Sequence, residues 1–183
     1  MNIYIGWDNG VTGSVGILGN GIAKQFPMPT KSCLNYQKTK VKHITRIDIV
    51  ALRKLLKLET TFDAQYQCAD VPITMGSFCK ALVERPMISP QRFEATTSAL
   101  RALEVVLIIL EEFDIGYNYV DSKAWQKVLL PNVTGEQYNR DKSIYKKLSL
   151  EVGKRMFPSI DFHKDADGIL IAKYCQMYWE DKQ

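Results

Sequence analysis

Hydrophobic and polar positions alternate near the start of the chain with the period of short strands. Ile3, Ile5 and Trp7 are apolar at every second position, which predicts a strand with one buried face. A cluster of small polar residues follows, and apolar residues return at 15–18 in a second strand. The sequence "GNG" then predicts a tight turn into a third strand at 21–26. The chain is therefore expected to begin with an antiparallel meander.

Farther along, the pattern alternates between helical spacing and short apolar runs. Residues 47–58 and 91–113 have helical spacing, and the apolar positions of the second segment cover most of its circumference, so we expect it to pack on the sheet. Two short runs, 80–86 and 117–122, predict strands. Further helices are expected at 123–130, at 141–157 and from about residue 165 onward, and exposed loops at 27–45 and 135–143.

This order of elements defines the fold class. Three strands are followed by helix, strand, helix, strand and then helices, which predicts an α/β fold with a mixed sheet flanked by helices. With 183 residues and 46% hydrophobic positions, the chain is long enough for one sizeable core and short for two ordinary domains. We therefore expect residues 1–183 to form a single domain.

Composition adds limits on location and chemistry. No apolar run approaches the length of a membrane span, and an acidic residue interrupts the N-terminal apolar run, so we expect a soluble, cytoplasmic protein without a membrane partner. The four cysteines are too far apart for a zinc or disulfide framework and are expected to be reduced thiols: Cys33, Cys68, Cys79 and Cys175.

Charge is modest in total but uneven along the chain. The formal net charge is +4, and basic residues gather at 31–57 and again at 123–155. Such stretches are either solvated faces or contacts for a polyanion such as nucleic acid.

Carboxylates occupy matching places in the predicted fold. Asp8 ends the first strand, Glu84 ends the fourth, and Asp165 and Asp167 open the last helix. If the first and fourth strands are neighbours, these groups meet at one edge of the sheet. Clustered carboxylates raise one another's pKa, and Mg²⁺ or Mn²⁺, which prefer oxygen ligands, resolve that conflict. Two such ions can clamp the attacking water and the leaving oxygen of a phosphodiester.

Structural interpretations of the same residues stay open. Asp8 could accept backbone N–H groups in a turn, and Asp165 could cap the last helix. His163 lies four residues before Asp167, so on a continuous helix both would share a face. It is then either a metal ligand or proton shuttle, or a surface histidine in a loop.

Taken together, five segments resemble the RuvC-type Holliday junction resolvases, especially their phage-like and organellar branch. The resemblance extends over nearly the whole chain and is weakest at 30–81. It implies an RNase H-like fold, a homodimer, and Mg²⁺-dependent symmetric nicking of four-way DNA junctions. The segments are "IYIGWDNGVTGSVGIL", "ALVERPM", "VDSKAWQKVLLP", "DKSIYKKLSLEVGKRMFPS" and "HKDADGILIAKY".

Site residues follow from this resemblance by motif. Its first, second and C-terminal acids fall on Asp8, Glu84 and Asp167, and His163 matches a histidine that precedes the last acid in many members. Relatives usually carry a basic residue where Asp165 stands and an alanine in place of the glycine at 168. The fourth ligand is therefore open between His163 and Asp165.

The expected activity is a structure-selective endonuclease acting on four-way and other branched DNA. Asp8 would bridge two Mg²⁺ ions, with Mn²⁺ as a substitute, Glu84 would hold one, and Asp167 with Asp165 or His163 the other. The nicks would carry 5′-phosphate and 3′-hydroxyl ends. A broader flap or RNase H-like nuclease is the alternative within nucleases.

A third possibility comes from "IGWDNGVTGSVGIL", which also resembles the first phosphate loop of sugar kinases and actin-like ATPases. Such phosphotransferases need a second domain and a second phosphate loop, for which this chain has no room. A DNA-binding protein without catalysis would keep the basic stretches and lose the acids.

Basic side chains in segments leading toward the acids are candidate phosphate contacts. Phe93 heads the long helix and is either a base-stacking side chain or the first core contact of that helix. The candidate phosphate contacts are Lys123, Lys127, Lys142, Lys146 and Lys147.

Symmetric cutting of a four-way junction needs two sites, which predicts a two-fold homodimer. The candidate interface is a leucine stripe on the long helix, and the alternative is burial of that stripe under the C-terminal helices. The stripe consists of Leu100, Leu103, Leu107 and Leu110.

Overall fold

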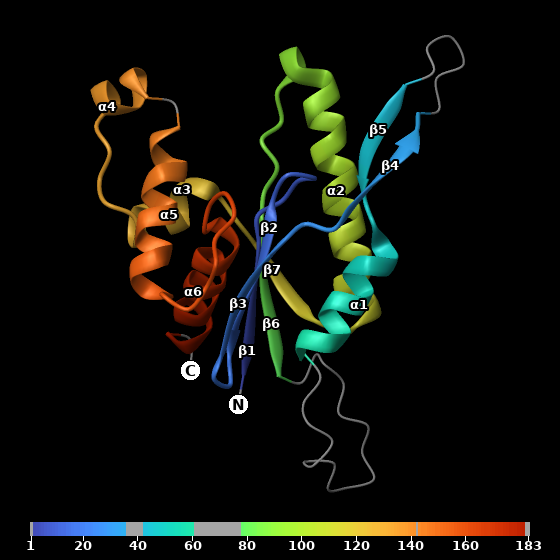
Figure 1. Cartoon of the computed structure of the whole chain (residues 1–183), viewed down its shortest axis with the longest axis horizontal. Coiled ribbons are helices and arrows are strands. Elements are labelled where there is room, and N and C mark those ends of the chain that lie inside the picture. Colours follow the sequence, from blue (N-terminus) through green and yellow to red (C-terminus); the bar gives the residue numbers. More distant parts are fainter. Residues whose placement is uncertain (1, 36–41, 61–77, 142, 182–183) are drawn as a thin grey trace, which may run out of the picture.

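A five-stranded mixed sheet runs through the middle of the molecule, with helices on both faces (Figure 1). The computed structural model describes residues 2–35, 42–60, 78–141 and 143–181. β1 pairs antiparallel with β2 and parallel with β6, so the first and fourth predicted strands are neighbours as expected. The order across the sheet is β3-β2-β1-β6-β7, with β1 (Ile3–Trp7), β2 (Ser14–Gly19), β3 (Ile22–Pro27), β6 (Cys79–Glu84) and β7 (Gly116–Val120).

The helices form two layers, one on each face of this sheet (Figure 1). One layer holds α1 (Ile49–Thr60) and α2 (Phe93–Glu112), the second of which follows a short 3₁₀ turn. The other holds α3 (Ser122–Leu129), α5 (Ile144–Met156) and α6 (Asp167–Glu180). These positions confirm the predicted mixed sheet with an antiparallel start and flanking helices.

β1 is buried along its whole length because it has a helical layer on each side. Its alternate residues Ile3, Ile5 and Trp7 belong to the core beneath α1 and α2. Tyr4 belongs to the core beneath α6. Even-numbered residues of β1 therefore face α6, and the residue after Trp7 continues that face.

Glycines allow α6 to lie directly on the strands. A Cβ atom at Gly6 or Gly16 would overlap the α6 main chain at Gly168, and at Gly6 also at Ala172. Only a residue without a side chain permits this approach. The first turn of α6 is thereby fixed over β1 and β2 by main-chain contact.

One prediction was wrong in the segment 27–45, which contains strands and is not wholly a loop. β4 (Thr30–Leu34) and β5 (His43–Ile47) pair antiparallel as a separate two-stranded sheet, with Thr30 opposite Ile47. Most of their side chains are exposed, so the apolar alternation that marks a half-buried strand is missing. Residues 36–41 lie outside the described part of the chain.

A second wrong prediction concerns residues 135–143, expected as a loop. They include the short helix α4 (Gly135–Arg140). A capping box starts it: Gln137 N–H donates to the Thr134 hydroxyl at 3.2 Å, and Thr134 N–H donates to the Gln137 side chain at 2.8 Å. A polar helix of this kind lacks the apolar period that the sequence analysis used.

The long helix α2 packs on the sheet as predicted, but its leucine stripe is not one free surface. Leu110 is fully buried in the core, and Leu103 packs against that core. Leu100 is 42% exposed. The alternative of burial under the C-terminal helices is also wrong, because α2 and α6 lie on opposite faces of the sheet (Figure 1).

The cysteines that the structure describes are free thiols, with Cys79 and Cys175 buried and Cys33 partly exposed. Cys68 lies in an undescribed segment. Among the described residues, no helix has the length and apolar character needed to cross a membrane.

Candidate active site

Two acidic residues lie where neighbouring parallel strands end at the same edge of the sheet: Asp8 directly follows β1, and Glu84 is the last residue of β6. Trp7 of β1 is paired with Val83 of β6, so Asp8 and Glu84 come next on each strand. Leu82 belongs to the core beneath α6, which places alternate residues of β6 on that face. The alternation along β1 and β6 therefore places Asp8 and Glu84 on the face of the sheet that α6 covers.

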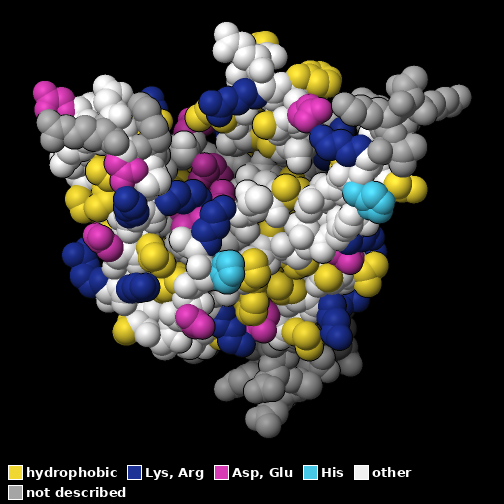
Figure 2. Space-filling model, turned by 45° about the horizontal axis from the view of Figure 1, so that its top comes forward, with side chains coloured by type: hydrophobic (Ala, Val, Ile, Leu, Met, Phe, Trp, Pro, Cys, Tyr) yellow, Lys and Arg dark blue, Asp and Glu magenta, His cyan; other side chains and the backbone are white. Residues whose placement is uncertain are grey.

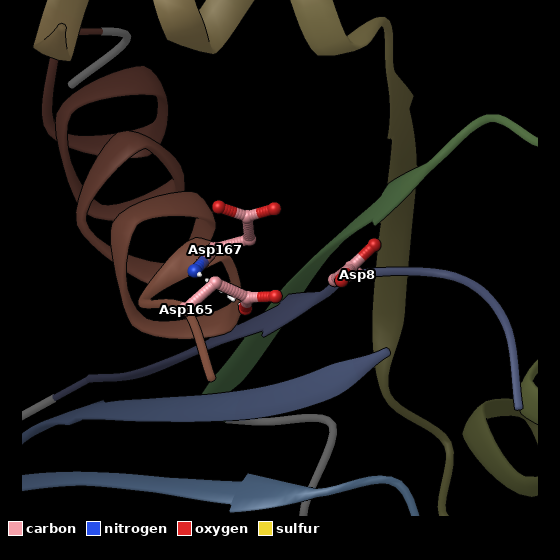
Figure 3. A group of neighbouring side chains, drawn as sticks. All are labelled: Asp8, Asp165 and Asp167. Carbon is pink, nitrogen blue, oxygen red and sulfur yellow. Dashed lines mark hydrogen bonds between the residues drawn. The ribbon is translucent and has the colours of Figure 1, made fainter. Parts of the chain in front are cut away.

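Asp165 and Asp167 come from the opposite direction, at the start of α6 (Figure 3). The Ser149 hydroxyl on α5 donates to the Asp167 carboxylate. The Gln25 amide on β3 donates to the main-chain oxygen of Asp165 at 2.6 Å. Both acids are thus held by partners from other elements.

The free N–H groups at the start of α6 are satisfied by side chains from the sheet and α5. The N–H of Gly168 donates to the Ser14 hydroxyl at 3.1 Å, and that of Ile169 to the Gln25 side chain at 2.9 Å. The Ala166 N–H donates to the Ser149 hydroxyl at 3.2 Å. Of the described main-chain N–H groups at this helix start, the Asp165 carboxylate accepts that of Asp167, at 3.3 Å, so it is not the main cap of this helix.

Three carboxylates meet at this place (Figure 3). One oxygen each from Asp8, Asp165 and Asp167 lies within 4.8 Å of the others. Their side chains are 15%, 4% and 8% exposed, respectively. We refer to these three residues as the acidic cluster.

A lysine ammonium lies in the acidic cluster. Nζ of Lys146, on α5, is 3.5 Å from Asp8 and 2.9 Å from Asp165, and it also contacts Asp167. Burial alone would lower the pKa of Lys146, but the negative charges of Asp8 and Asp167 outweigh it and raise that pKa. The predicted phosphate-binding lysine is therefore a cation bound by three carboxylates.

Burial shifts the ionisation of the acids. It raises the pKa of Asp8 to about 7, against the lowering effect of Lys146. It also raises the pKa of Asp167. These carboxyls bind protons far more readily than acids in water.

Glu84 lies beside the acidic cluster without being one of its three grouped residues. Its carboxylate accepts a hydrogen bond from the indole N–H of Trp125 at 2.9 Å, and Trp125, on α3, is fully buried. Burial, helped by the negative charges of Asp8 and Asp167, raises the pKa of Glu84 to about 7. Glu84 thus interacts electrostatically with the cluster and is held in place by Trp125.

His163 is not one of the grouped residues. α6 begins at Asp167, so His163 and Asp167 are not on one continuous helix. The imidazole is exposed and lines a hollow next to Asp165. Of the two candidates for the fourth ligand, the structure places Asp165 in the acidic cluster.

Basic side chains surround this region unevenly. Figure 2 shows Lys and Arg side chains beside a recessed group of acidic ones. Lys123 and Lys127 are exposed on α3, and Lys147 is exposed and pairs with Asp141 at 2.6 Å. Lys142 lies outside the described residues.

Phe93 is 73% exposed at the first residue of α2. The interpretation of Phe93 as a core contact is therefore wrong. Its ring lines a hollow of about 350 Å³ between α2 and the β4–β5 hairpin, together with His43 and Arg101. An exposed ring among basic side chains is compatible with base stacking.

The arrangement suits a hard divalent cation. Its donors are carboxylate oxygens, which Mg²⁺ and Mn²⁺ prefer, and the cluster already holds one positive group in the ammonium of Lys146. Three acids with so little exposure are stable as anions only beside such a charge. The residues present therefore fit a divalent metal site.

Several residues that hold the site were not found from the sequence. Ser149 and Gln25 act only through contacts between distant segments, and no local pattern marks them. Trp125 lies within one of the motifs quoted above, "VDSKAWQKVLLP", but its link to Glu84 depends on tertiary packing. The positive charge of Lys146 predicts a contact with DNA phosphate, but in the structure its ammonium contacts the carboxylates of the acidic cluster.

Solved structures with the same fold come from Thermus thermophilus. One is RuvC in complex with a Holliday junction substrate, with TM-score 0.57, 11% identity, and coverage of 99% of this chain and 96% of that one. Another is Thermus thermophilus RuvC, with TM-score 0.53, 12% identity, and coverage of 98% and 96%. No protein-family model and no curated protein matches the sequence. The similarity confirms the expected RNase H-like fold of RuvC over nearly the entire chain.

Proposed function

We propose that this protein is a divalent-metal-dependent endonuclease that resolves four-way and other branched DNA. The observation that carries the proposal is the buried acidic cluster at the carboxyl end of β1, in a chain with the RuvC fold. A structure with that fold is described with a Holliday junction as its substrate. The expected location is the cytoplasm, where the chain would meet such DNA.

Asp8, Asp165 and Asp167 would hold the metal, with Glu84 at its edge. Mg²⁺ is the proposed ion and Mn²⁺ its substitute, because all donors are carboxylates. When bound, such ions activate a water and stabilise charge on a phosphodiester. Trp125, Ser149 and Gln25 keep the acids in position through the hydrogen bonds described above.

Basic side chains would position the DNA. Lys123, Lys127 and Lys147 are exposed and can reach phosphates, and Phe93 can stack on a base. The role of Lys142 as a phosphate contact remains a prediction from the sequence alone. Lys146 would contact phosphate only after leaving the carboxylates.

A homodimer completes the proposal. The described part of each chain offers one acidic cluster, and resolution of a four-way junction requires cuts in two strands. A two-fold dimer supplies two clusters related by symmetry. The products would carry 5′-phosphate and 3′-hydroxyl ends.

A phosphotransferase of the actin-like kind is not proposed. This chain matches RuvC chains over 98–99% of its own length and 96% of theirs. A broader flap or RNase H-like nuclease is separated by comparing cleavage of a four-way junction, a Y-junction, an RNA–DNA hybrid and linear duplex. Preference for the junction supports the proposal, and equal rates on junction and hybrid support the broader nuclease.

The direct test is the Asp8→Asn variant. With Mg²⁺ present, it should bind junction DNA but nick it at least about a hundredfold more slowly, because a ligand of the charge-stabilising ion is lost. Asp181→Asn makes the same chemical change on an exposed residue after the end of α6 and should cut normally. Nicking of labelled junctions on denaturing gels measures both. Full activity of a folded Asp8→Asn protein would falsify the proposed site.

A further inference from the structure

A second hollow lies beside the acidic cluster and is not used by the proposed chemistry. It has a volume of about 310 Å³ and is formed by the β1–β2 loop, the end of β3 and the segment before α6. Asp165 and Ser14 belong both to its wall and to the contacts that hold the cluster. The hollow is therefore adjacent to the place where the scissile phosphate is proposed to bind.

One side of the hollow is apolar. Val11, Pro27 and Met28 line it; Met28 is 4% exposed, Val11 is half-buried and Pro27 is exposed. The N–H of Met28 donates to the oxygen of Gly13 at 3.0 Å, which fixes β3 to the β1–β2 loop. The apolar side is thus a formed surface and not a gap between loose segments.

The other side is polar and holds a cation. Thr12, His163 and Lys164 are exposed along it. Lys164 brings a positive charge, and an imidazole has an N–H donor in either neutral tautomer. Asp161 brings a negative charge to the same rim.

We propose that this hollow binds the nucleotide next to the scissile phosphate, with its sugar and base on Val11, Pro27 and Met28 and its phosphate at Lys164 and His163. The volume lies at the lower end of the range of about 300–1,000 Å³ that ligand pockets occupy, as suits one nucleotide. An apolar wall opposite a cation matches the two parts of a nucleotide. The inference rests on the proposed function and extends it to a substrate subsite.

This assignment gives His163 a role that fits its position. The side chain is exposed in the hollow and outside the acidic cluster, so it positions substrate and does not hold metal. A His163→Ala variant should therefore keep the Mn²⁺ affinity of the wild type, measured by calorimetry without DNA. It should lose affinity for DNA.

The decisive experiment pairs Lys164→Ala with single uncharged phosphates. Junctions carrying one methylphosphonate linkage at each position near the branch are bound in EDTA and followed by fluorescence anisotropy. Lys164→Ala should weaken binding of the natural junction about tenfold. Its slope of log affinity against log salt should fall by about 1. A methylphosphonate at one linkage, adjacent to the linkage that is cut, should weaken DNA binding by the wild type but not by Lys164→Ala.

Two controls separate a local contact from a general charge effect. Lys54→Ala removes an exposed lysine from α1, on the opposite face of the sheet, and should leave binding unchanged. Asp161→Asn removes the like charge beside the proposed phosphate and should tighten binding by up to about fivefold. Asp181→Asn, beyond the far end of α6, should not.

Each outcome decides between the two claims. If the wild type prefers junctions but Lys164→Ala weakens all linkages alike, the subsite is wrong and the proposed function stands. If the wild type binds duplex and junction equally, the proposed function fails. The same set of single methylphosphonate linkages, placed in duplex DNA, then still tests whether Lys164 contacts one phosphate. A protein that binds no DNA would overturn both.

Discussion

At the scale of single residues, the site is dominated by the competition between burial and charge. Burial raises the pKa of Asp8 and of Glu84 to about 7 from ordinary values of 3.8 and 4.5. The ammonium of Lys146 opposes that shift and keeps the acidic cluster from being a set of bare anions. Protons and cations therefore compete for the same oxygens.

A pH dependence of stability follows for the protein in EDTA. Between about pH 4 and pH 7 the unfolded carboxyls have lost their protons while folded Asp8 and Glu84 keep theirs. The folded state then binds more protons, so the free energy of unfolding should fall as pH rises through this window and level off above about 7. The slope is at most about 1.4 kcal/mol per pH unit and carboxyl.

Urea unfolding at a series of pH values measures this slope. Glu84→Gln keeps an acceptor for Trp125 but cannot ionise, so its slope should be shallower than that of the wild type. Saturating Mg²⁺ should flatten the dependence in the wild type, because the ion favours the ionised carboxyls. A wild type whose stability rises between about pH 5 and pH 7 in EDTA would contradict the assigned shifts.

At the scale of elements, the position of α6 determines whether the site exists. Gly16 of β2 lies against the main chain of α6 at Gly168, and no side chain separates them. The same contact places Asp167 next to the end of β1. Any group inserted there must move the helix.

Gly16→Ala should destabilise the fold by about 1–3 kcal/mol and weaken metal binding, since the added methyl group overlaps main chain that cannot rotate away. Gly135→Ala is the matched control. A Cβ atom at Gly135, at the start of α4, would meet nothing within 4 Å. Chemical denaturation of both variants gives the comparison, and equal stability of the two would contradict the close contact.

The elements that could be predicted from sequence are those with a buried face. β1 could be predicted because the apolar side chains of Ile3, Ile5 and Trp7 indicate a buried face. β6 could be predicted because the apolar run ending at Glu84 indicates a buried strand. The β4–β5 hairpin and α4 were missed because main-chain pairing and a capping box stabilise them with little apolar burial.

The same reasoning separates what could be foreseen of the site. The ends of neighbouring parallel strands bring Asp8 and Glu84 to one edge, which follows from element order. The distance of His163 from the acidic cluster depends on where α6 begins, and helix boundaries are poorly specified by sequence. The pairing of Lys146 with three acids joins α5 to β1 and α6, and no local pattern contains it.

At the scale of the whole molecule, the outward face of α2 is where a second copy is expected to bind. Leu100 and Ile108 are 42% and 46% exposed there, on the side away from the sheet. A Leu100→Glu, Ile108→Glu variant should sediment as a monomer at micromolar concentration, because charge repels the symmetric contact. This variant should still nick one strand of a junction, but it should no longer cut both strands in one encounter.

Val50→Glu is the control for that experiment. Val50 is 69% exposed on α1, so the change adds one negative charge to another helix, against two in the double variant, and should leave the dimer intact. A wild-type protein that stays monomeric on junction DNA, yet cuts both strands in one encounter, would refute the dimer.

The ammonium of Lys146 also affects the order of events in the life of the protein. Zinc-finger domains fold only when they bind their metal ion, because no other group neutralises or links their ligands. Here Lys146 brings a positive charge to the acids from within the chain itself, so we expect folding not to require the metal. Under the proposed function, protein made without divalent ions would be folded but inactive, and addition of the ion would start cleavage.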